Sequence, residues 1–158
     1  MKLDDILRTI RHFQSTIPVD VEGLALALGI KVRKVFLGPK ISGVVRRIDD
    51  GFEIKVNADH PETRQRFTIA HEIGHFVLHR ALMGDGNVDD CAYRSDGSVK
   101  NNRIGPRQET EANKFAAWLL MPSEAIADLR KTGIDDARTM ARRLNVSEGA
   151  MRIRLGIA

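Results

Sequence analysis

The sequence predicts an α+β fold, and three features of its hydrophobic pattern support this class. Residues 1–29 carry apolar side chains at the three- and four-residue spacing of amphipathic helices. Residues 30–57 change to the two-residue alternation of β-strands. From about residue 62 onward the helical spacing returns. A block of strands between helical segments is typical of α+β proteins, and 158 residues are enough to bury a core.

The first third of the chain supplies two helices and most of the sheet. A helix is expected over 3–13, and a shorter one over 21–29 ends at Gly29, which suits a left-handed cap. Three strands are then expected, at 30–37, 41–48 and 51–57. Asp50-Gly51 lies between the last two and favours a hairpin, so we expect a small, mostly antiparallel sheet.

The remainder of the chain is mainly helical. A long helix should run from about residue 62 to His79 or Arg80, and another over 109–120, with two or three short helices in 123–155. The polar connection 84–107 has one strand candidate, at 91–94. We expect a core at 1–122 and a helix-turn-helix-like region at 123–158 that packs on it, together one structural domain.

Composition and charge narrow the cellular setting. No apolar run approaches the length of a membrane span, and residues 1–14 lack the apolar region of a secretory signal. The single cysteine, Cys91, cannot form an internal disulfide, which favours the reducing cytoplasm. The net charge of +4 lies entirely in 130–158, where seven basic residues face three acidic ones. Such a region suits an acidic partner or nucleic acid, or is a solvated helix face.

The segment FTIAHEIGHFVLH, residues 67–79, places titratable side chains in an apolar helix. His71 and His75 are four residues apart, so both imidazoles reach one ion from one helix face. Glu72 is offset by about 100° and is a candidate general base for an attacking water. Two neutral imidazoles suit zinc. The alternative is chance histidines on a core helix, but two buried imidazoles would then still need partners.

Two neighbours of this motif need separate interpretation. His79 lies about 12 Å along the helix axis from His71, too far to share an ion, so we interpret it as a helix-end residue or a second-sphere partner of a ligand. Gly74 costs about 1 kcal/mol relative to alanine in mid-helix, which indicates that another backbone or a substrate approaches there.

A third ligand must come from another segment, and 109–122 offers two glutamates. On a helical wheel Glu109 lies about 60° from the centre of the apolar stripe, and Glu111 about 100° on the other side. Glu109 is therefore better placed to reach an ion on a neighbouring helix. Both residues would otherwise serve as favourable acids at a helix N-terminus.

These segments, RFTIAHEIGHFVLH and ETEANKFAAWLLMP, resemble the ImmA/IrrE family of bacterial metallo-endopeptidases. The similarity extends to PVDVEGLALALGIKV, ISGVV, VNA and LNVSEGAMRIRLG, nearly the whole chain. The resemblance implies a zincin-like fold, a small sheet beside an HExxH active-site helix. It assigns His71, His75 and Glu109 as zinc ligands and Glu72 as the catalytic residue. It also implies cleavage of a helix-turn-helix (Xre-type) repressor, which relieves repression of mobile-element or stress-response genes.

Residues 137–156, ARTMARRLNVSEGAMRIRLG, fit a loose helix-turn-helix pattern. Its four arginines are candidates for docking a protein partner or, less favoured, for direct DNA binding: Arg142, Arg143, Arg152 and Arg154. The alternative is a helical pair that packs on the core with its arginines in water. In the 84–107 connection, Tyr93 and Arg94 are candidate donors to a transition-state oxyanion.

The sequence therefore predicts a cytoplasmic metallo-endopeptidase that uses Zn²⁺, with Mn²⁺ as an alternative ion. The competing hypothesis is a DNA-binding or repressor-sequestering module whose metal site is vestigial. The presence of Glu72 favours the enzyme, because a module that only binds has no need of a base.

Overall fold

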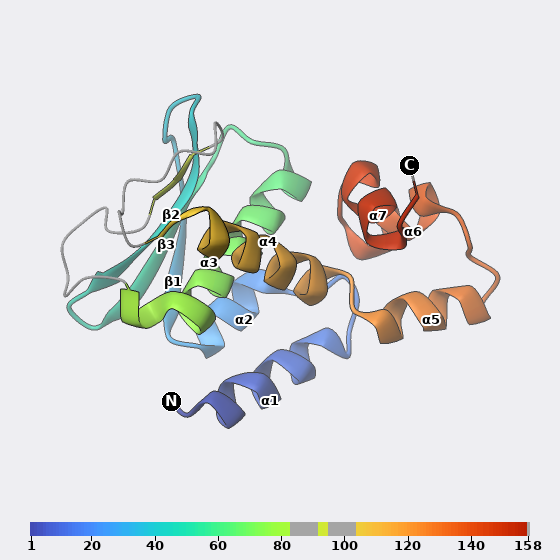
Figure 1. Ribbon diagram of the computed structural model, residues 1–158, viewed down its shortest axis with the longest axis horizontal. Helices are drawn as coiled ribbons and strands as arrows, with labels where there is room; N and C mark the ends of the chain where they lie inside the picture. Colours follow the sequence, from blue (N-terminus) through green and yellow to red (C-terminus); the bar gives the residue numbers. More distant parts are fainter. Residues whose placement is uncertain (83–91, 95–103, 158) are drawn as a thin grey trace.

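The computed structural model describes residues 1–82, 92–94 and 104–157 and confirms the α+β class. Within these residues, helices α1 (Leu3–Gln14) and α2 (Val21–Ala27) precede a four-stranded sheet, and α3 (Glu62–His79), η1 (Arg80–Leu82) and α4 (Pro106–Leu120) follow its first three strands. Helices α5 (Ser123–Lys131), α6 (Ala137–Leu144) and α7 (Glu148–Leu155) complete the chain (Figure 1).

The sheet is mostly antiparallel, as the sequence predicts, with one parallel pairing. Its strands are β1 (Ile30–Val35), β2 (Ile41–Ile48), β3 (Gly51–Asn57) and β4 (Ala92–Arg94), in the order β1-β3-β2-β4. The predicted β2–β3 hairpin is present, and β2 also pairs antiparallel with β4. Strand β3 lies between the consecutive strands β1 and β2, and it pairs parallel with β1.

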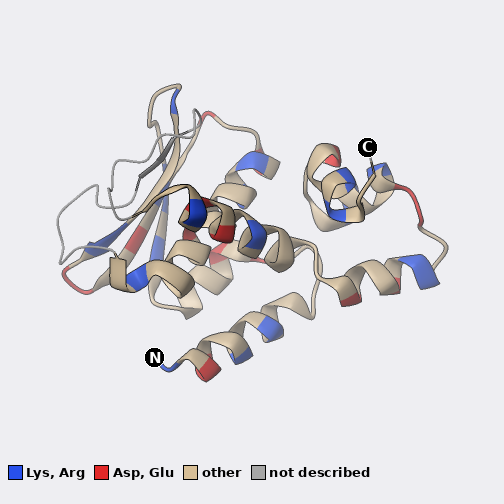
Figure 2. Cartoon of the chain, viewed as in Figure 1, with Lys and Arg blue, Asp and Glu red and all other residues tan. Residues whose placement is uncertain are grey.

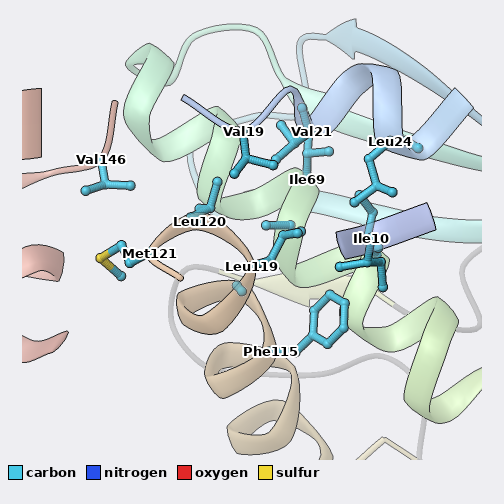
Figure 3. Packing of buried hydrophobic residues seen from close by; sticks show 14 of the residues in the cluster. Ile10, Val19, Val21, Leu24, Ile69, Phe115, Leu119, Leu120, Met121 and Val146 are labelled. Atoms are coloured by element: carbon cyan, nitrogen blue, oxygen red, sulfur yellow. The ribbon is translucent and has the colours of Figure 1, made fainter. Parts of the chain in front are cut away.

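Helices α2 and α3 pack against the sheet, and α1 and α4 pack on these two helices (Figure 1). Helix α3 contacts β2 and β3 on one side and α4 on another. Its residues 68–76 are therefore all buried, as expected for a helix covered on several sides. Figure 3 shows Ile10 of α1, Leu24 of α2, Ile69 of α3 and Leu119 of α4 in one hydrophobic cluster.

The close approach that Gly74 indicated is made by Phe115 of α4. A Cβ atom at position 74 would lie 3.0 Å from Phe115 Cδ1 and 3.2 Å from its Cβ. The group that approaches Gly74 is thus the Phe115 side chain, including its Cβ atom, which cannot move far from the α4 backbone. Absence of a side chain at Gly74 lets the two helices approach closely at the level of the HExxH motif.

The C-terminal helices extend from the end of α4 (Figure 1) and join the same hydrophobic cluster through Met140, Val146 and Met151. Arg66 of α3 donates hydrogen bonds to the backbone oxygens of Asn145 and Leu144, at 3.0 and 3.5 Å. These carbonyls end α6, where they have no partner within the helix. The division of the chain at residues 122 and 123 stays a prediction.

The expected strand near 91–94 is present as β4, whereas Cys91 and most of the 84–107 connection lie outside the described residues. In the part of the chain that the structure describes, no helix has both the length and the apolar character needed to cross a bilayer.

Two glycine substitutions test the packing of α3 on α4. Gly74→Ala should lower the free energy of unfolding by about 1 kcal/mol, because overpacking against Phe115 outweighs the gain in helix propensity. Gly149→Ala in α7 has no atom within 4 Å of the added Cβ and should raise stability by about 0.5–1 kcal/mol. Urea denaturation of the metal-free proteins measures both. Equal stabilisation by the two changes would contradict the described packing.

Candidate metal centre

Two helices bring the three predicted ligands together. Helix α3 presents His71 and His75 on one face, one turn apart, and α4 presents Glu109 from its first turn. All three residues are buried, and one ligand atom from each lies within 4.8 Å of the others. Among the described residues this is the group of histidine and acidic side chains with the spacing of a metal site.

The donor atoms converge on one another. The Nε2 atoms of His71 and His75 are 3.0 Å apart, and they lie 3.1 and 2.9 Å from the two carboxylate oxygens of Glu109. Despite these short separations, neither Glu109 oxygen receives a hydrogen bond of good geometry from the described part of the chain. Buried carboxylate oxygens without donors are costly, and a shared cation removes that cost. The residues present therefore fit a metal ion.

The charge state of this group also suits a cation. Burial opposes charge on Glu109, but its contacts with His71 and His75 hold the pKa of the carboxyl down at about 2. Burial lowers the pKa of His75 below its ordinary value, which favours the neutral ring that binds metals. Burial acts on His71 in the same direction, but Glu109 and Glu72 outweigh it and raise its pKa. In the metal-free protein His71 therefore holds a second proton more readily than His75 does. Metal binding is expected to release that proton from His71.

Glu72 lies on the sheet-facing side of α3 and is fully buried. In the metal-free chain, burial raises the pKa of its carboxyl to about 8, although the neighbouring His71 opposes the shift. A Cβ atom at Gly43 of β2 would lie 2.5 Å from Thr68 Cγ2 and 3.8 Å from Glu72 Cγ. Glycine at position 43 thus lets this part of α3 lie directly against β2. The predicted catalytic carboxyl is held in a dry site beside the ligands.

The structure adds partners for both histidine ligands. His71 Nδ1 lies 2.8 Å from Asn113 Oδ1, and His75 Nδ1 lies 2.9 Å from His79 Nδ1. His79 in turn contacts Glu111 through its Nε2 atom, at 3.1 Å. His79 thus contacts one of the predicted ligands, and its role as a second-sphere residue stays a prediction.

Asn113 was missed by sequence reasoning, although its position gave a signal. It lies four residues after Glu109 and thus on the same face of α4, toward the HExxH helix. The helical wheel also placed Glu111 away from the ligand position, and in the structure Glu111 lies outside the group formed by His71, His75 and Glu109. It gave no indication that Glu111 reaches the centre through His79.

The other predicted site residues belong to other elements of the fold. Tyr93 and Arg94 are in β4, where the backbone of Tyr93 pairs with Gly43, but their side chains lie outside what the structure describes. Arg142 and Arg143 are exposed on α6, and Arg152 is half-buried on α7. Arg154 donates to the backbone oxygen of Met121 at 3.1 Å and to Ser123 Oγ at 2.8 Å, so it ties α7 to the start of α5.

The arrangement combines two imidazoles and one carboxylate with a buried glutamate at the adjacent position of the helix. Three protein ligands are typical of catalytic metal sites, which keep a further position for water or substrate. Structural zinc sites usually have four protein ligands. The donor set therefore fits hydrolytic chemistry that uses a metal ion and a proton acceptor.

Glu109→Ala should weaken metal binding by at least about 100-fold, because it removes one of three ligands and its negative charge. Glu124→Ala, which removes an exposed acid from the first turn of α5, is the matched control and should leave affinity unchanged. Competition with a chromophoric chelator measures both. Equal metal affinities for the two variants would contradict the ligand assignment.

Comparison with known proteins supports the same chemistry. The model of the IrrE N-terminal-like domain, a peptidase family, matches residues 25–156. Radiation response metalloprotease IrrE from Deinococcus deserti is 41% identical over 76 residues, which cover 48% of this chain and 25% of that protein. Its counterpart from Deinococcus radiodurans is 38% identical over 76 residues, covering 48% and 21%. The chain thus aligns with about a quarter or less of each relative's length. Since the family match covers most of the sequence and includes the metal centre, the chain belongs to the IrrE N-terminal-like domain family of metalloproteases.

Proposed function

We propose that this chain is a zinc-dependent endopeptidase that cleaves a helix-turn-helix repressor. The observation that carries the proposal is the buried group of His71, His75 and Glu109 with Glu72 at the next helix position. Zinc is the ion that such nitrogen and oxygen ligands most often hold in hydrolases, and manganese is the alternative. Family membership supports peptide hydrolysis as the reaction.

His71, His75 and Glu109 would hold the ion, which would act as a Lewis acid when bound. Glu72 accepts a proton at its carboxylate from the water that attacks the peptide carbonyl, and then returns that proton to the leaving amine. Burial suits this role, because a desolvated carboxylate is a stronger base than one in water. Burial also limits competing water around the carboxylate. Tyr93 and Arg94 stay predictions as donors to the oxyanion.

The repressor substrate is supported by the family resemblance of the sequence. The matched relatives carry the name radiation response metalloprotease, which supports a stress-response setting. A protein that cuts a DNA-bound regulator acts where the DNA is, so we propose the cytoplasm as its compartment. Cleavage would relieve repression of stress-response or mobile-element genes.

The C-terminal helices supply the surface that we propose for docking the repressor. Arg142 and Arg143 are exposed on α6, in the region that holds the excess of positive charge (Figure 2). A groove of about 430 Å³ lies between this region and α3. One wall is formed by the first turns of α3, and the other by the α6–α7 turn and α7. It includes Phe67 and also Ile153, which is 81% exposed.

This surface suits a protein better than DNA. An exposed isoleucine and an apolar groove match apolar side chains of a partner, whereas phosphates need cations and hydrogen-bond donors. Of the four arginines, Arg154 already binds Met121 and Ser123, so Arg142 and Arg143 are the main candidates for attracting an acidic face. Phe67 precedes His71 by one helical turn, about 6 Å along α3, so a partner held in the groove would lie near the metal centre.

Glu72→Gln tests the mechanism. It should keep metal binding and fold but lower the cleavage rate by about 10²–10⁴-fold or more, because glutamine cannot accept the proton of the attacking water. Incubation with the repressor encoded beside this gene, in the presence of zinc or manganese, followed by electrophoresis measures the rate. A wild-type rate for this variant would exclude Glu72 as the base, and a wild-type protein that holds no metal would exclude the site.

The double substitution Arg142→Glu with Arg143→Glu tests docking. It should slow cleavage of the intact repressor by about tenfold or more through charge repulsion, and leave unchanged the cleavage of a short peptide that spans the cut site. Arg8→Glu with Arg11→Glu makes the same charge change on exposed positions of α1 and serves as control.

Equal effects of the two double variants would show that docking does not use α6. A loss of salt-dependent operator binding by the α6 variant, with no cleavage by any form of the protein, would favour the DNA-binding module with a vestigial metal site.

A further inference from the structure

A line of hydrogen-bonding groups leads from the metal centre to the protein surface. It begins at His75, whose Nδ1 atom lies 2.9 Å from His79 Nδ1. It continues from His79 Nε2 to Glu111 Oε2, at 3.1 Å, and from Glu111 Oε1 to Arg107 Nε, at 2.9 Å. His75 and His79 are buried, the Glu111 side chain is 39% exposed and that of Arg107 is exposed.

The chemistry of these groups gives every bond in the line one consistent direction when both imidazole rings are neutral. Arginine only donates and a carboxylate only accepts, so Glu111 accepts from Arg107 and from His79 Nε2–H. A neutral His79 ring that donates from Nε2 has its lone pair at Nδ1, where it can accept from His75 Nδ1–H. His75 is left without a proton at Nε2, which is the atom that faces Glu109 and His71.

We propose that His79 and Glu111 are positioning residues for His75 as a metal ligand. His79 fixes the tautomer and the ring orientation of His75, and Glu111 does the same for His79. His71 obtains its orientation separately from Asn113 Oδ1. Each histidine ligand thus has its own acceptor from α4, directly through Asn113 or indirectly through Glu111. Outer partners of this kind typically change metal affinity by about 10–100-fold when removed.

A purely structural role makes a different prediction. If the His79–Glu111 pair only joined the end of α3 to α4, its loss would lower the stability of the metal-free protein and leave the metal environment unchanged. If the pair holds His75 in place, its loss weakens metal binding and alters the ligand field, with little effect on the metal-free fold. Spectroscopy of the bound metal separates these roles.

Because this role rests on the metal-dependent function proposed above, the test measures metal binding without any substrate. The variants are Glu111→Leu, which removes the acceptor at a partly exposed position, and Glu111→Gln, which keeps an acceptor oxygen of the same reach. His79→Phe removes the link at a buried position and keeps a ring there. Glu124→Leu, at an exposed site on α5, is the control. Zn²⁺ affinity is measured by chelator competition, and the Co²⁺-loaded proteins are compared by their visible absorption spectra.

We expect Glu111→Leu and His79→Phe to lower Zn²⁺ affinity by about 10–100-fold and to shift the Co²⁺ spectrum. Glu111→Gln should stay within about threefold of wild type, and Glu124→Leu should match it. Wild-type affinity and spectrum in both Glu111→Leu and His79→Phe would overturn the positioning role. A wild-type chain that binds metal but cuts no peptide would overturn the proposed function and leave this inference standing.

Discussion

Close packing of α3 on α4 determines whether the metal centre exists. The three ligands lie on two helices, and Glu109 follows His75 by a long stretch of chain, so only tertiary contact brings them together. Gly74 and Phe115 set the spacing of the helices at the level of the motif. Asn113 and Glu111 then contact the outer nitrogens of the HExxH helix from the same side. A small change in this one helix contact would move the ligand Glu109 together with Asn113 and Glu111 relative to the histidines of α3.

Burial of charged side chains in the centre also carries a free-energy cost that contacts within the protein do not offset. His71, Glu72, His75 and Glu109 are all buried, and the carboxylate oxygens of both glutamates have no donor in the described part of the chain. Burying unpaired charge is unfavourable, whereas a divalent cation beside Glu109 compensates for it. The low pKa of Glu109 and the raised pKa of Glu72 assign them opposite tasks. One carboxylate stays charged to hold a cation, and the other binds a proton readily.

Much of this centre could be predicted from the sequence because its geometry is local. The spacing of His71 and His75 fixes their common face on any helix, and the helical wheel separated Glu109 from Glu111 without tertiary information. The order of the strands could not be predicted in this way, since hydrophobic alternation is the same for parallel and antiparallel neighbours. The partner of His79 on α4 could not be predicted either, for a related reason. Contact between His79 and Glu111 depends on how two helices align, which no single-helix pattern records.

Arg66 holds the C-terminal region through backbone oxygens, and this has a consequence for how the protein can diversify. Its guanidinium recognises the carbonyls of Leu144 and Asn145, groups that every amino acid supplies. The joint between α3 and α6 therefore places no demand on the outward side chains of α6, at Arg142 and Arg143. Substitutions at those two positions would therefore leave this joint intact, and the helix that carries the metal ligands would keep its anchor.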